Sequence, residues 1–338
     1  MLFRRTLLSA LLPAAMAGLA LAAPAQAQNM MKVGLLTIND PQHIYADRFI
    51  EEVDKRTSGR IKGKSFPAGQ LGSIPREIEG LQLGTQEAFI TPPGFLQGIN
   101  EGFQVTDAPG MFDTIDHAFM SITDPEFGPK FLAQAERAGI VGLGMFASAF
   151  NSIASRTPLR KLDDLKGKKI RVLATKTETE MARRLGITGV PMSYDEVLPA
   201  IQQGTIDGAL SSHIVMATSK FPTVTKYITF MGASFIPSVL FVSKAWFDKL
   251  TPADQKVVRD VAAELQRPLT DEAIKFGEKA WDLWKADGAE IIQLSAEDRA
   301  EMMKRIRPIG DEILAANPKT KDMYETLKRI ADKHRKAG

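Results

Sequence analysis

Arg171 is the residue whose type and position offer the clearest binding chemistry. It follows Ile170 in a short apolar run that is typical of the end of a buried strand. A guanidinium group there can donate two parallel hydrogen bonds to a carboxylate, provided that it faces a cleft rather than bulk water. Spacing alone supports a surface ion pair with a nearby acid equally well. The segment 163–208 therefore predicts either an anion anchor or an exposed charge.

Gly142 to Ala147 matches the spacing G-x-G-x-x-A of a dinucleotide-binding turn. Two acidic residues, Asp163 and Asp164, lie about 20 residues further on, as such a site requires. The context does not fit, because the residues from Ala147 to Pro158 lack the amphipathic period of the helix that would have to follow. We therefore interpret the two glycines as positions in a closely packed strand.

Metal and catalytic chemistry are poorly represented in the sequence. There is no cysteine, which excludes disulfides and thiol chemistry. No metal-ligand spacing joins the histidines, which are His43, His117, His213 and His334. Three of them are predicted to be surface or capping residues, whereas His213 lies close to the segment of Arg171 and stays a candidate for ligand binding. Since motifs for nucleophiles, zinc, calcium and phosphate are missing, we expect a binding protein without metal or cofactor, not an enzyme.

Residues 1–27 have the three parts of an export signal. A positive start at Arg4 and Arg5 precedes a long apolar run, and Ala25-Gln26-Ala27 supplies the small residues of a cleavage site. An uncleaved membrane anchor is the alternative, because the apolar run is about long enough to span a bilayer. We expect cleavage after Ala27 and a mature protein in the periplasm.

Charge and size narrow the function of the mature chain. Loss of the two leader arginines lowers the formal net charge from +3 to +1 (3 − 2). Binding to nucleic acid requires a basic surface that neutralises phosphates, so nucleic acid is excluded as a partner. The remaining 311 residues (338 − 27) are enough for one large or two ordinary domains held together by hydrophobic cores.

The elements that must position Arg171 alternate between strands and helices. Apolar runs predict strands at 31–38, 61–66, 87–91, 139–147, 170–173, 205–210 and 236–242. Helices with periodic apolar faces lie between several of these strands, and they end at Gly59, Gly84, Gly186 and Gly204. This alternation predicts an α/β fold with crossover units around a mostly parallel sheet.

Capping residues and prolines give more local predictions. The pairs Thr177–Glu180 and Ser193–Glu196 have the spacing of capping boxes at helix starts. A very long helical pattern runs from Pro252 to about Asp287, which is more than one domain needs. An interior proline costs about 3 kcal/mol. We therefore expect the helix with Pro199 to start late or bend, and the long helix to kink or break at Pro268.

A series of short motifs covers nearly the whole mature chain. In chain order they are F-x-x-x-V at 49–53, S-G-R-I at 58–61, G-Q-L-G at 69–72, E-x-x-x-L-Q-x-G-T at 77–85, D-L-K-G-K-K-I-R-V at 164–172, P-M-x-x-x-E-V at 191–197, Q-Q-G-x-x-D-G at 202–208 and L-T-P-A-D-Q-K-V-V at 250–258. The series resembles the extracytoplasmic solute-binding proteins of tripartite ATP-independent periplasmic (TRAP) transporters, the DctP family.

The resemblance implies a two-domain periplasmic binding protein fold with crossing strands, a long domain-spanning helix and a ligand cleft between the domains. Domain I would comprise 28–147 and 237–276, and domain II would comprise 148–236 and 277–338. The resemblance also implies that the domains close over a small organic acid and that the closed form delivers it to membrane permease subunits of a TRAP transporter.

The resemblance assigns roles to particular positions. Arg171 matches the family arginine that pairs with a ligand carboxylate, and Tyr194 falls where the family tends to place an aromatic ring against the ligand. Ser211 falls where many members carry a polar side chain. To these we add residues around the expected cleft as candidates for ligand binding: Thr91, Phe95, Phe150, Asn151 and His213.

Two departures from the family pattern bear on the ligand. Members of the sialic-acid type have a second arginine in the segment that here is 146–151, and a Glu and an Arg after the strand that here ends at Thr91. This chain has no arginine in that segment, and the next one is Arg156. After Thr91, residues 92–95 are Pro-Pro-Gly-Phe instead of the expected Glu and Arg. We therefore expect a monocarboxylate with an apolar or aromatic body, such as an aromatic or branched-chain oxo acid. Each unpaired polar group of a buried sugar would cost about 1–3 kcal/mol.

Two other functions stay open on the sequence alone. A protein of the same fold could present its ligand to a sensor kinase instead of a permease. An exported enzyme is the more distant alternative, and it would show turnover instead of stoichiometric retention of a ligand.

Overall fold

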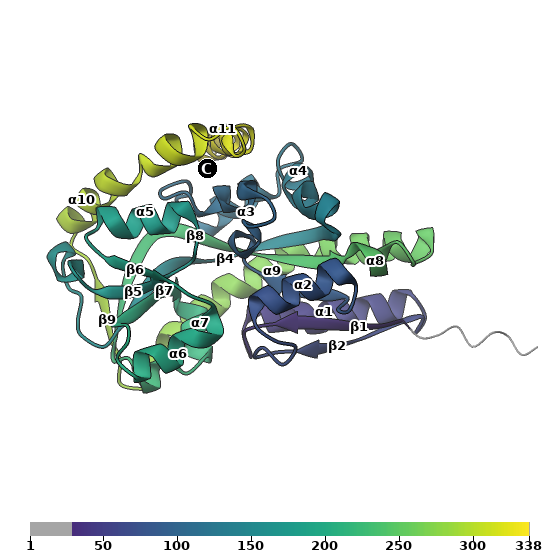
Figure 1. Cartoon of the computed structure of the whole chain (residues 1–338), viewed down its shortest axis with the longest axis horizontal. Helices are drawn as coiled ribbons and strands as arrows, with labels where there is room; N and C mark the ends of the chain where they lie inside the picture. The colour runs from purple at the N-terminus through teal and green to yellow at the C-terminus, as the bar shows by residue number, and fades with distance from the viewer. Residues whose placement is uncertain (1–28, 338) are drawn as a thin grey trace, which may run out of the picture.

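The chain folds into a mixed α/β structure around one sheet. This computed structural model describes residues 29–337, so the predicted export signal at 1–27 lies outside the described residues. Within that range, nine strands form a sheet in the order β2-β1-β3-β8-β4-β7-β5-β6, and β9 pairs with β8. Helices cover the sheet, as Figure 1 shows, and the predicted α/β class is confirmed.

The sequence predicted most of the strands, but it missed β6 and β9. The strands are β1 (Asn29–Leu35), β2 (Ile61–Phe66), β3 (Ala88–Thr91), β4 (Ile140–Ser155), β5 (Lys169–Val172), β6 (Thr188–Pro191), β7 (Gly208–Ser212), β8 (Tyr227–Ser243) and β9 (Glu290–Gln293). The α-helices are α1 (Pro41–Arg56), α2 (Ile74–Leu83), α3 (Ile115–Ile122), α4 (Gly128–Leu132), α5 (Lys176–Arg184), α6 (Tyr194–Gln202), α7 (His213–Thr218), α8 (Lys244–Phe247), α9 (Pro252–Ala286), α10 (Ala296–Ile306) and α11 (Lys321–Ala337). Two short 3₁₀ helices, η1 (Pro93–Leu96) and η2 (Glu101–Asp107), follow β3.

The long strands β4 and β8 connect the two halves of the sheet. They pair with each other in antiparallel orientation, and the sequence predicted only about half of each. One end of β8 also pairs with β3, whereas its other end pairs with β9. The far end of β4 pairs with β7, which lies next to β5. The two strands therefore belong to both halves, as the crossing strands of the expected fold must.

The glycines of the G-x-G-x-x-A match have a packing role. A Cβ atom on Gly142 would lie 2.7 Å from the carbonyl oxygen of Leu132, and one on Gly144 would lie 2.7 Å from that of Ala262 in α9. No helix follows Ala147, because β4 continues to Ser155. The interpretation as a closely packed strand is confirmed, and the dinucleotide turn is excluded.

Helix α9 is continuous through Pro268, so the predicted break there is wrong. Side chains on either side of this proline hold the helix to β4: the backbone N–H of Met145 donates to Gln266 Oε1 at 3.0 Å, and that of Ala147 donates to Thr270 Oγ1 at 3.0 Å. These contacts offset the one donor that a proline removes. Helix α6 likewise includes Pro199 and begins at Tyr194, so it does not start late.

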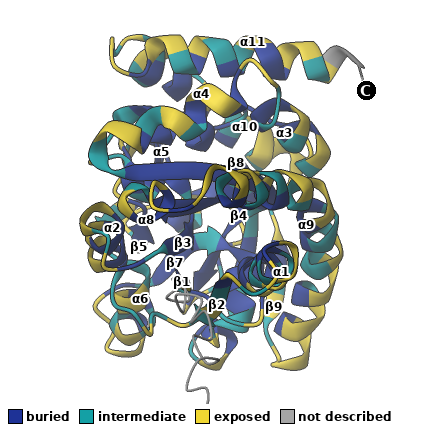
Figure 2. Cartoon of the chain, turned by 90° about the vertical axis from the view of Figure 1, so that its right-hand side faces the viewer, coloured by how far each residue is buried: buried dark blue, intermediate teal, exposed yellow. Residues whose placement is uncertain are grey.

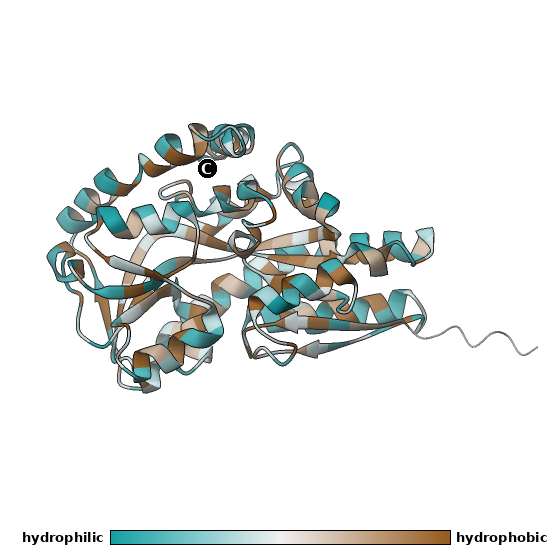
Figure 3. Cartoon of the chain, viewed as in Figure 1, coloured by the Kyte–Doolittle hydropathy of each residue, from teal (hydrophilic) through white to brown (hydrophobic). Residues whose placement is uncertain are grey.

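Hydrophobic clusters fill both halves of the molecule. Residues of α9 from Val258 to Ala273 pack with β1 and α1, whereas Ala280 and Trp284 pack with α6 and α7. Helix α9 thus spans the two halves, as predicted. Figure 2 shows the buried sheet between helices whose outer faces are exposed, and Figure 3 shows apolar residues concentrated along the strands. No helix in the described part of the chain is both long and apolar enough to cross a membrane.

The exact domain limits stay a prediction. The C-terminal helix α11 was assigned to domain II, but Leu327 and Ile330 share a cluster with Phe103 and Phe131 of the predicted domain I. Helix α11 also contacts α3 and η2. The packing of α11 therefore attaches it to the first half of the chain, although it follows the second half in sequence.

Candidate functional site

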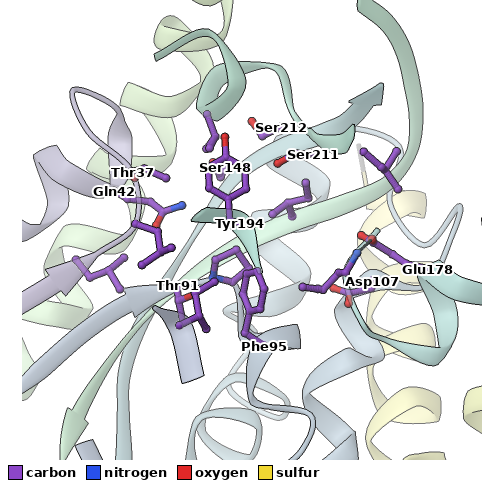
Figure 4. A pocket seen from close by; sticks show the side chains of 18 of the residues that line it. Thr37, Gln42, Thr91, Phe95, Asp107, Ser148, Glu178, Tyr194, Ser211 and Ser212 are labelled. Atoms are coloured by element: carbon purple, nitrogen blue, oxygen red, sulfur yellow. Dashed lines mark hydrogen bonds between the residues drawn. The ribbon is translucent and has the colours of Figure 1, made fainter. Parts of the chain in front are cut away.

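A cavity lies where the two halves of the chain meet. Its volume, counted as the space open to the centre of a water-sized sphere, is about 60 Å³. Five of the residues predicted from the sequence line it: Thr91, Phe95, Arg171, Tyr194 and Ser211. Figure 4 shows Phe95 and Tyr194 near the centre of the group, with the serines on one side and two acidic side chains on another.

Arg171, near the end of β5, is buried with only 4% of its surface exposed. Its Nε donates to the carbonyl oxygen of Met192 at 3.1 Å, and its Nη1 donates to that of Leu210 at 3.3 Å. Its Nη2 has no hydrogen-bond partner among the described residues. No described carboxylate lies within ion-pair distance of Arg171, so the alternative of a surface ion pair is wrong.

Two aromatic rings flank the guanidinium of Arg171. The ring centroids of Phe95 and Tyr194 each lie 5.9 Å from its central carbon. Burial lowers the pKa of Arg171, and the charge of Glu178 opposes this shift. An arginine nevertheless stays protonated in a protein. The cavity therefore contains a desolvated cation with one free N–H-bearing nitrogen, which is an arrangement that can bind a carboxylate.

Local structure fixes the rings and the strand ends. Tyr194 is the first residue of α6, whose predicted capping box is confirmed: the N–H of Ser193 donates to Glu196 Oε2 at 3.3 Å. The ring of Tyr194 stacks on Phe221 with centroids 5.9 Å apart. Phe95 lies in η1 and Thr91 ends β3, directly before it. Element ends thus form part of the cavity wall, and the long strands β4 and β8 contribute Ser148 and Ile236 from their interiors.

The other predicted capping box was misplaced by two residues. Thr175, not Thr177, caps α5, and its Oγ1 accepts from the N–H of Glu178 at 3.2 Å. Glu178 Oε2 in turn accepts from the N–H of Leu173 at 2.6 Å. This geometry turns the carboxylate of Glu178 into the cavity instead of leaving it on the helix surface.

Asp107, the last residue of η2, is a second carboxyl in the cavity that the sequence did not predict. It is 6% exposed, and its Oδ2 has no hydrogen-bond partner within the described range. Burial, together with the charge of Glu178, raises the pKa of Asp107 well above its usual range. Burial also raises the pKa of Glu178, while the charge of Arg171 opposes that shift. The only feature of the sequence that could have indicated a buried Asp107 is its position as the single acid in the largely apolar segment 103–112.

Further polar residues complete the lining of the cavity. Thr37 and Gln42 come from the start of α1 and the loop before it, and Ser212 lies beside Ser211. Ser148 lies in the segment of β4 where sialic-acid-type relatives are expected to carry an arginine. None of these four residues was predicted from the sequence, because a lone polar residue carries no distinctive pattern.

Three predicted residues do not line the cavity. Asn151 is buried in the sheet, where its Oδ1 accepts from the N–H groups of Ala233 and Ser234. Phe150 packs edge-on against Phe235. His213 lies against α9, where it contacts Gly277 and Trp281. The geometry gives no support to a ligand contact for these three side chains.

His213 stabilises the contact between α7 and α9. Its ring stacks on Trp281 with centroids 4.0 Å apart and a 7° angle between planes, and its Nε2 lies 3.2 Å from the carbonyl oxygen of Gly277. Burial lowers the pKa of His213 to about 4. Across residues 29–337, no group of three or more acidic, histidine or cysteine side chains is arranged to hold a metal ion.

The mixed α/β fold, with a cavity where its two halves meet, matches that of two-domain solute-binding proteins. The profile of the DctP family, whose members are described as bacterial extracellular solute-binding proteins of family 7, matches residues 34–317. The chain belongs to this family, as the series of motifs predicted.

Relatives and solved structures agree with this assignment. The chain is 33% identical over 293 residues to a solute-binding protein of Verminephrobacter eiseniae, with 85% of this chain and 86% of the relative covered. It is 31% identical over 317 residues to a C4-dicarboxylate-binding periplasmic protein of Rhodobacter capsulatus, with 91% and 94% covered. A TRAP periplasmic solute-binding protein from Xanthobacter autotrophicus, crystallised with bound β-D-galacturonate, matches with a TM-score of 0.82 and 29% identity over 88% of this chain and 99% of that one. The family comprises periplasmic transport proteins that bind their substrates.

Proposed function

We propose that this chain captures a small monocarboxylate in the periplasm and delivers it to the membrane permease subunits of a TRAP transporter. One observation carries the proposal: Arg171 Nη2 is buried in the cavity, between two aromatic rings, without a hydrogen-bond partner in the described part of the chain. An unpaired buried donor costs about 1–3 kcal/mol. A ligand carboxylate accepts a hydrogen bond from this donor. It is also attracted to the Arg171 cation more strongly than it would be in water, because the dielectric constant of a buried site is lower.

The charges of the cavity favour one carboxylate over two. Among the described lining residues Arg171 is the only lysine or arginine, whereas Asp107 and Glu178 are both acids. A second ligand carboxylate would be desolvated without a cation and would face these acids, which is strongly unfavourable. The ligand therefore differs from the C4-dicarboxylates that name the Rhodobacter relative.

The body of the ligand meets a mixed surface. Apolar side chains line one part of the cavity, and they include Leu36, Ile74, Ile90, Phe95 and Ile236. These residues favour an apolar or aromatic body, since buried apolar area contributes about 25 cal/mol per Å².

A sugar acid is the second candidate, and a specific observation favours it. Thr37, Gln42, Ser148, Ser211 and Ser212 present hydroxyl and amide groups to the same cavity. The Xanthobacter structure contains a sugar acid in a protein of this fold. A branched-chain monocarboxylate and a sugar acid differ in how many hydroxyl groups they would have to pair, so a direct comparison of the two decides between the candidates.

Contacts between the halves near the cavity fit a closed form. Lys176 of α5 reaches two residues of η2: its backbone N–H donates to Gln104 Oε1 at 3.1 Å, and its Nζ lies 2.7 Å from Glu101 Oε2. Gln97 also donates to the carbonyl oxygen of Ala174. These bonds join the two predicted domains and would break when the cleft opens. A permease that recognises the closed form would then receive only the loaded protein.

A ligand screen tests the proposal directly. The purified protein, from Gln28 onward, is titrated with aliphatic and aromatic monocarboxylates, with succinate, and with galacturonate. A ligand that binds only the folded state adds about 2.7 kcal/mol to the free energy of unfolding when its concentration is 100 times its Kd. The melting temperature rises accordingly. We expect the largest shift with an aliphatic or aromatic monocarboxylate. Tighter binding of succinate would refute the single-carboxylate assignment, and tighter binding of galacturonate would favour the sugar-acid candidate.

The same preparation separates the remaining alternatives. An exported enzyme would convert the ligand, so intact ligand recovered in a 1:1 ratio after long incubation excludes turnover. A sensor kinase partner is separated from a permease by transport: vesicles with the TRAP permease subunits should accumulate the ligand only when this protein is added.

A further inference from the structure

A second hollow adjoins the cavity that contains Arg171. Three residues line both spaces: Ile74 of α2, Phe95 of η1 and Leu173, which directly follows β5. The second space, which we call the apolar hollow, is also lined by Ile78, Gly98, Ile99, Ala174, Pro191 and Met192. Both halves of the chain thus contribute to it, and Phe95, which Figure 4 shows within the cavity, lies at the boundary between the two spaces.

The apolar hollow offers little to a polar or charged group. Among the described residues that line it, only Gln97 and Ser193 have polar side chains, and none is charged. Gln97 Nε2 donates to the carbonyl oxygen of Ala174, and the hydroxyl of Ser193 donates to Asp195. The hollow therefore favours a hydrocarbon, because removal of apolar surface from water is the main favourable contribution that such a wall can make.

The two spaces differ in size. Counted in the same way, the volume of the apolar hollow is about 400 Å³, against about 60 Å³ for the cavity beside Arg171. One water molecule needs about 10–15 Å³ of such space, so the smaller cavity accommodates a carboxylate and only about one to three further atoms. A ligand with a larger body therefore has to extend past Phe95, and the adjoining space is the apolar hollow.

Contacts of Arg171 place the cation beside the entrance to the apolar hollow. Its Nε donates to the carbonyl oxygen of Met192, which lines the hollow, at 3.1 Å. The ring of Phe95 has its centroid 5.9 Å from the guanidinium carbon and lines the hollow as well. The hydrogen bond from Gln97 to Ala174 joins the two halves of the chain at the hollow. A carboxylate bound to Arg171 can therefore direct the rest of the ligand into this space while the halves stay together.

We propose that the apolar hollow is a second subsite, which holds the hydrocarbon tail of the ligand while Arg171 holds its carboxylate. The substrate class is the elongated monocarboxylates, whose unbranched hydrocarbon tail is too long for the small cavity alone. This inference rests on the proposed function, since Arg171 must bind the carboxylate. A sugar acid is disfavoured, because hydroxyl groups that extend into the hollow would meet only two polar side chains and would lose their hydrogen bonds to water.

A chain-length series with the unmodified protein tests the second subsite. Butyrate, hexanoate and octanoate are titrated by calorimetry, with octanol as the probe that lacks a carboxylate. Each CH₂ group that becomes buried strengthens binding about fourfold, so octanoate should bind at least about tenfold tighter than butyrate. An affinity that stays level or falls beyond butyrate overturns the inference and leaves the hollow to a protein partner. Octanol that binds as tightly as octanoate also overturns it, because the tail would then bind independently of Arg171.

Gly98→Leu separates the apolar hollow from the cavity beside Arg171. A Cβ atom on Gly98 would have no heavy atom within 4 Å apart from those of its chain neighbours, so a leucine fills part of the hollow without a clash. The variant should bind octanoate at least about fivefold more weakly, while its affinity for butyrate stays within about twofold. Equal losses for the two acids overturn the inference, and so does an unchanged affinity for octanoate.

Gly98→Ala is the matched control for Gly98→Leu. It restricts the backbone in the same way but adds only a methyl group, so its affinity for both acids should stay within about twofold of the original. A crystal structure of the unmodified protein with octanoate gives an independent readout. Tail atoms in contact with Ile78 and Ile99 support the inference, whereas a tail that points into solvent or folds back within the cavity overturns it.

Failure of this inference is distinguishable from failure of the proposed function. If butyrate binds and Arg171→Ala abolishes its binding, but the longer acids bind no better, only the second subsite is refuted. If none of the carboxylates binds, the proposed function is refuted, and the inference that rests on it is refuted as well.

Discussion

Arg171 and His213 are two buried basic residues whose surroundings differ. Each has one nitrogen without a hydrogen-bond partner in the described structure, Arg171 Nη2 and His213 Nδ1. Arg171 lines the cavity, with two aromatic ring centroids 5.9 Å from its guanidinium carbon, whereas the ring of His213 is stacked on Trp281 at 4.0 Å. Both were candidates from the sequence. An unpaired buried nitrogen indicates a ligand site only where an empty, accessible volume lies beside it.

Arg171→Ala should produce the largest effect on ligand binding. An unchanged affinity would contradict the distinction between Arg171 as a ligand site and His213 as a structural contact. Burial of a ligand carboxylate without its cation costs about 3–5 kcal/mol, so affinity for the best carboxylate should fall at least about 100-fold. The melting temperature without ligand should stay the same or rise, because an incompletely paired buried charge is removed. Calorimetric titration and thermal unfolding measure the two quantities.

Arg183→Ala is the matched control for Arg171→Ala. Arg183 lies close to Arg171 in the sequence, but its side chain is 71% exposed and pairs with Glu180 on the surface of α5. Its loss should leave affinity unchanged. A similar loss of affinity in both variants would show that the positive field of the region, and not the buried guanidinium, attracts the ligand.

His213 should control stability with pH, and not ligand affinity. Its pKa is lowered to about 4 in the folded state, whereas an unfolded histidine titrates near 6.5. Above pH 6.5 both states are neutral. As the pH falls from 6.5 towards 4 the unfolded state gains a proton that the folded state does not, so about 3 kcal/mol of stability is lost.

Denaturant titrations at pH 7.5 and 4.5 measure this loss. His213→Phe retains an aromatic ring against Trp281 but cannot be protonated, so its stability should depend less on pH. A binding defect of His213→Phe at neutral pH would contradict the assignment of His213 to the α7–α9 contact.

Tyr194 tests how much of the cavity's binding energy comes from a ring. Tyr194→Ala removes the face that lies 5.9 Å from the guanidinium carbon and should weaken carboxylate binding about tenfold, as expected for a cation–π contact and lost apolar area. Tyr194→Phe keeps that face, and we expect a change of less than about threefold. Equal losses in the two variants would assign the effect to the hydroxyl instead.

The sequence predicted the cavity's cation better than its acids, for a physical reason. Arg171 follows a local apolar run typical of a strand, and the family resemblance then favoured an anchor over a surface ion pair and added Tyr194. Asp107 becomes part of the site only because η2 folds back against α5, which is a long-range arrangement without a local signal. Glu178 was missed because the cap of α5 was assigned to Thr177, two residues after the true cap Thr175, so the capping pattern pointed to Glu180 instead.

The fold shows the same division between local and long-range information. Most predicted strands were found within about three residues of their predicted ends, because each is a short apolar run bounded by turns. The second half of β4, 148–155, was missed because serine, alanine and asparagine have weak strand preference and both faces are buried, so no alternation is visible. The crossing strands were inferred from the family resemblance, not from that stretch.

Substitution of Glu101 should have the smallest effect on ligand affinity. Glu101 makes an exposed contact between the two halves, in contrast to the buried Arg171. It pairs with Lys176 Nζ at 2.7 Å and with Lys319 Nζ at 2.9 Å, and hydrogen bonds from these lysines and from Asn317 lower the pKa of Glu101 to about 2. Both lysines are more than half exposed, so the pairs contribute only about 0–1 kcal/mol. Glu101→Gln should therefore weaken ligand binding less than about fivefold. The change should come through faster dissociation, since the cleft opens more often, and it should diminish in high salt. Stopped-flow dissociation of a bound carboxylate at low and high ionic strength measures it, and a tenfold or larger effect would mean that closure depends on this contact as much as on Arg171.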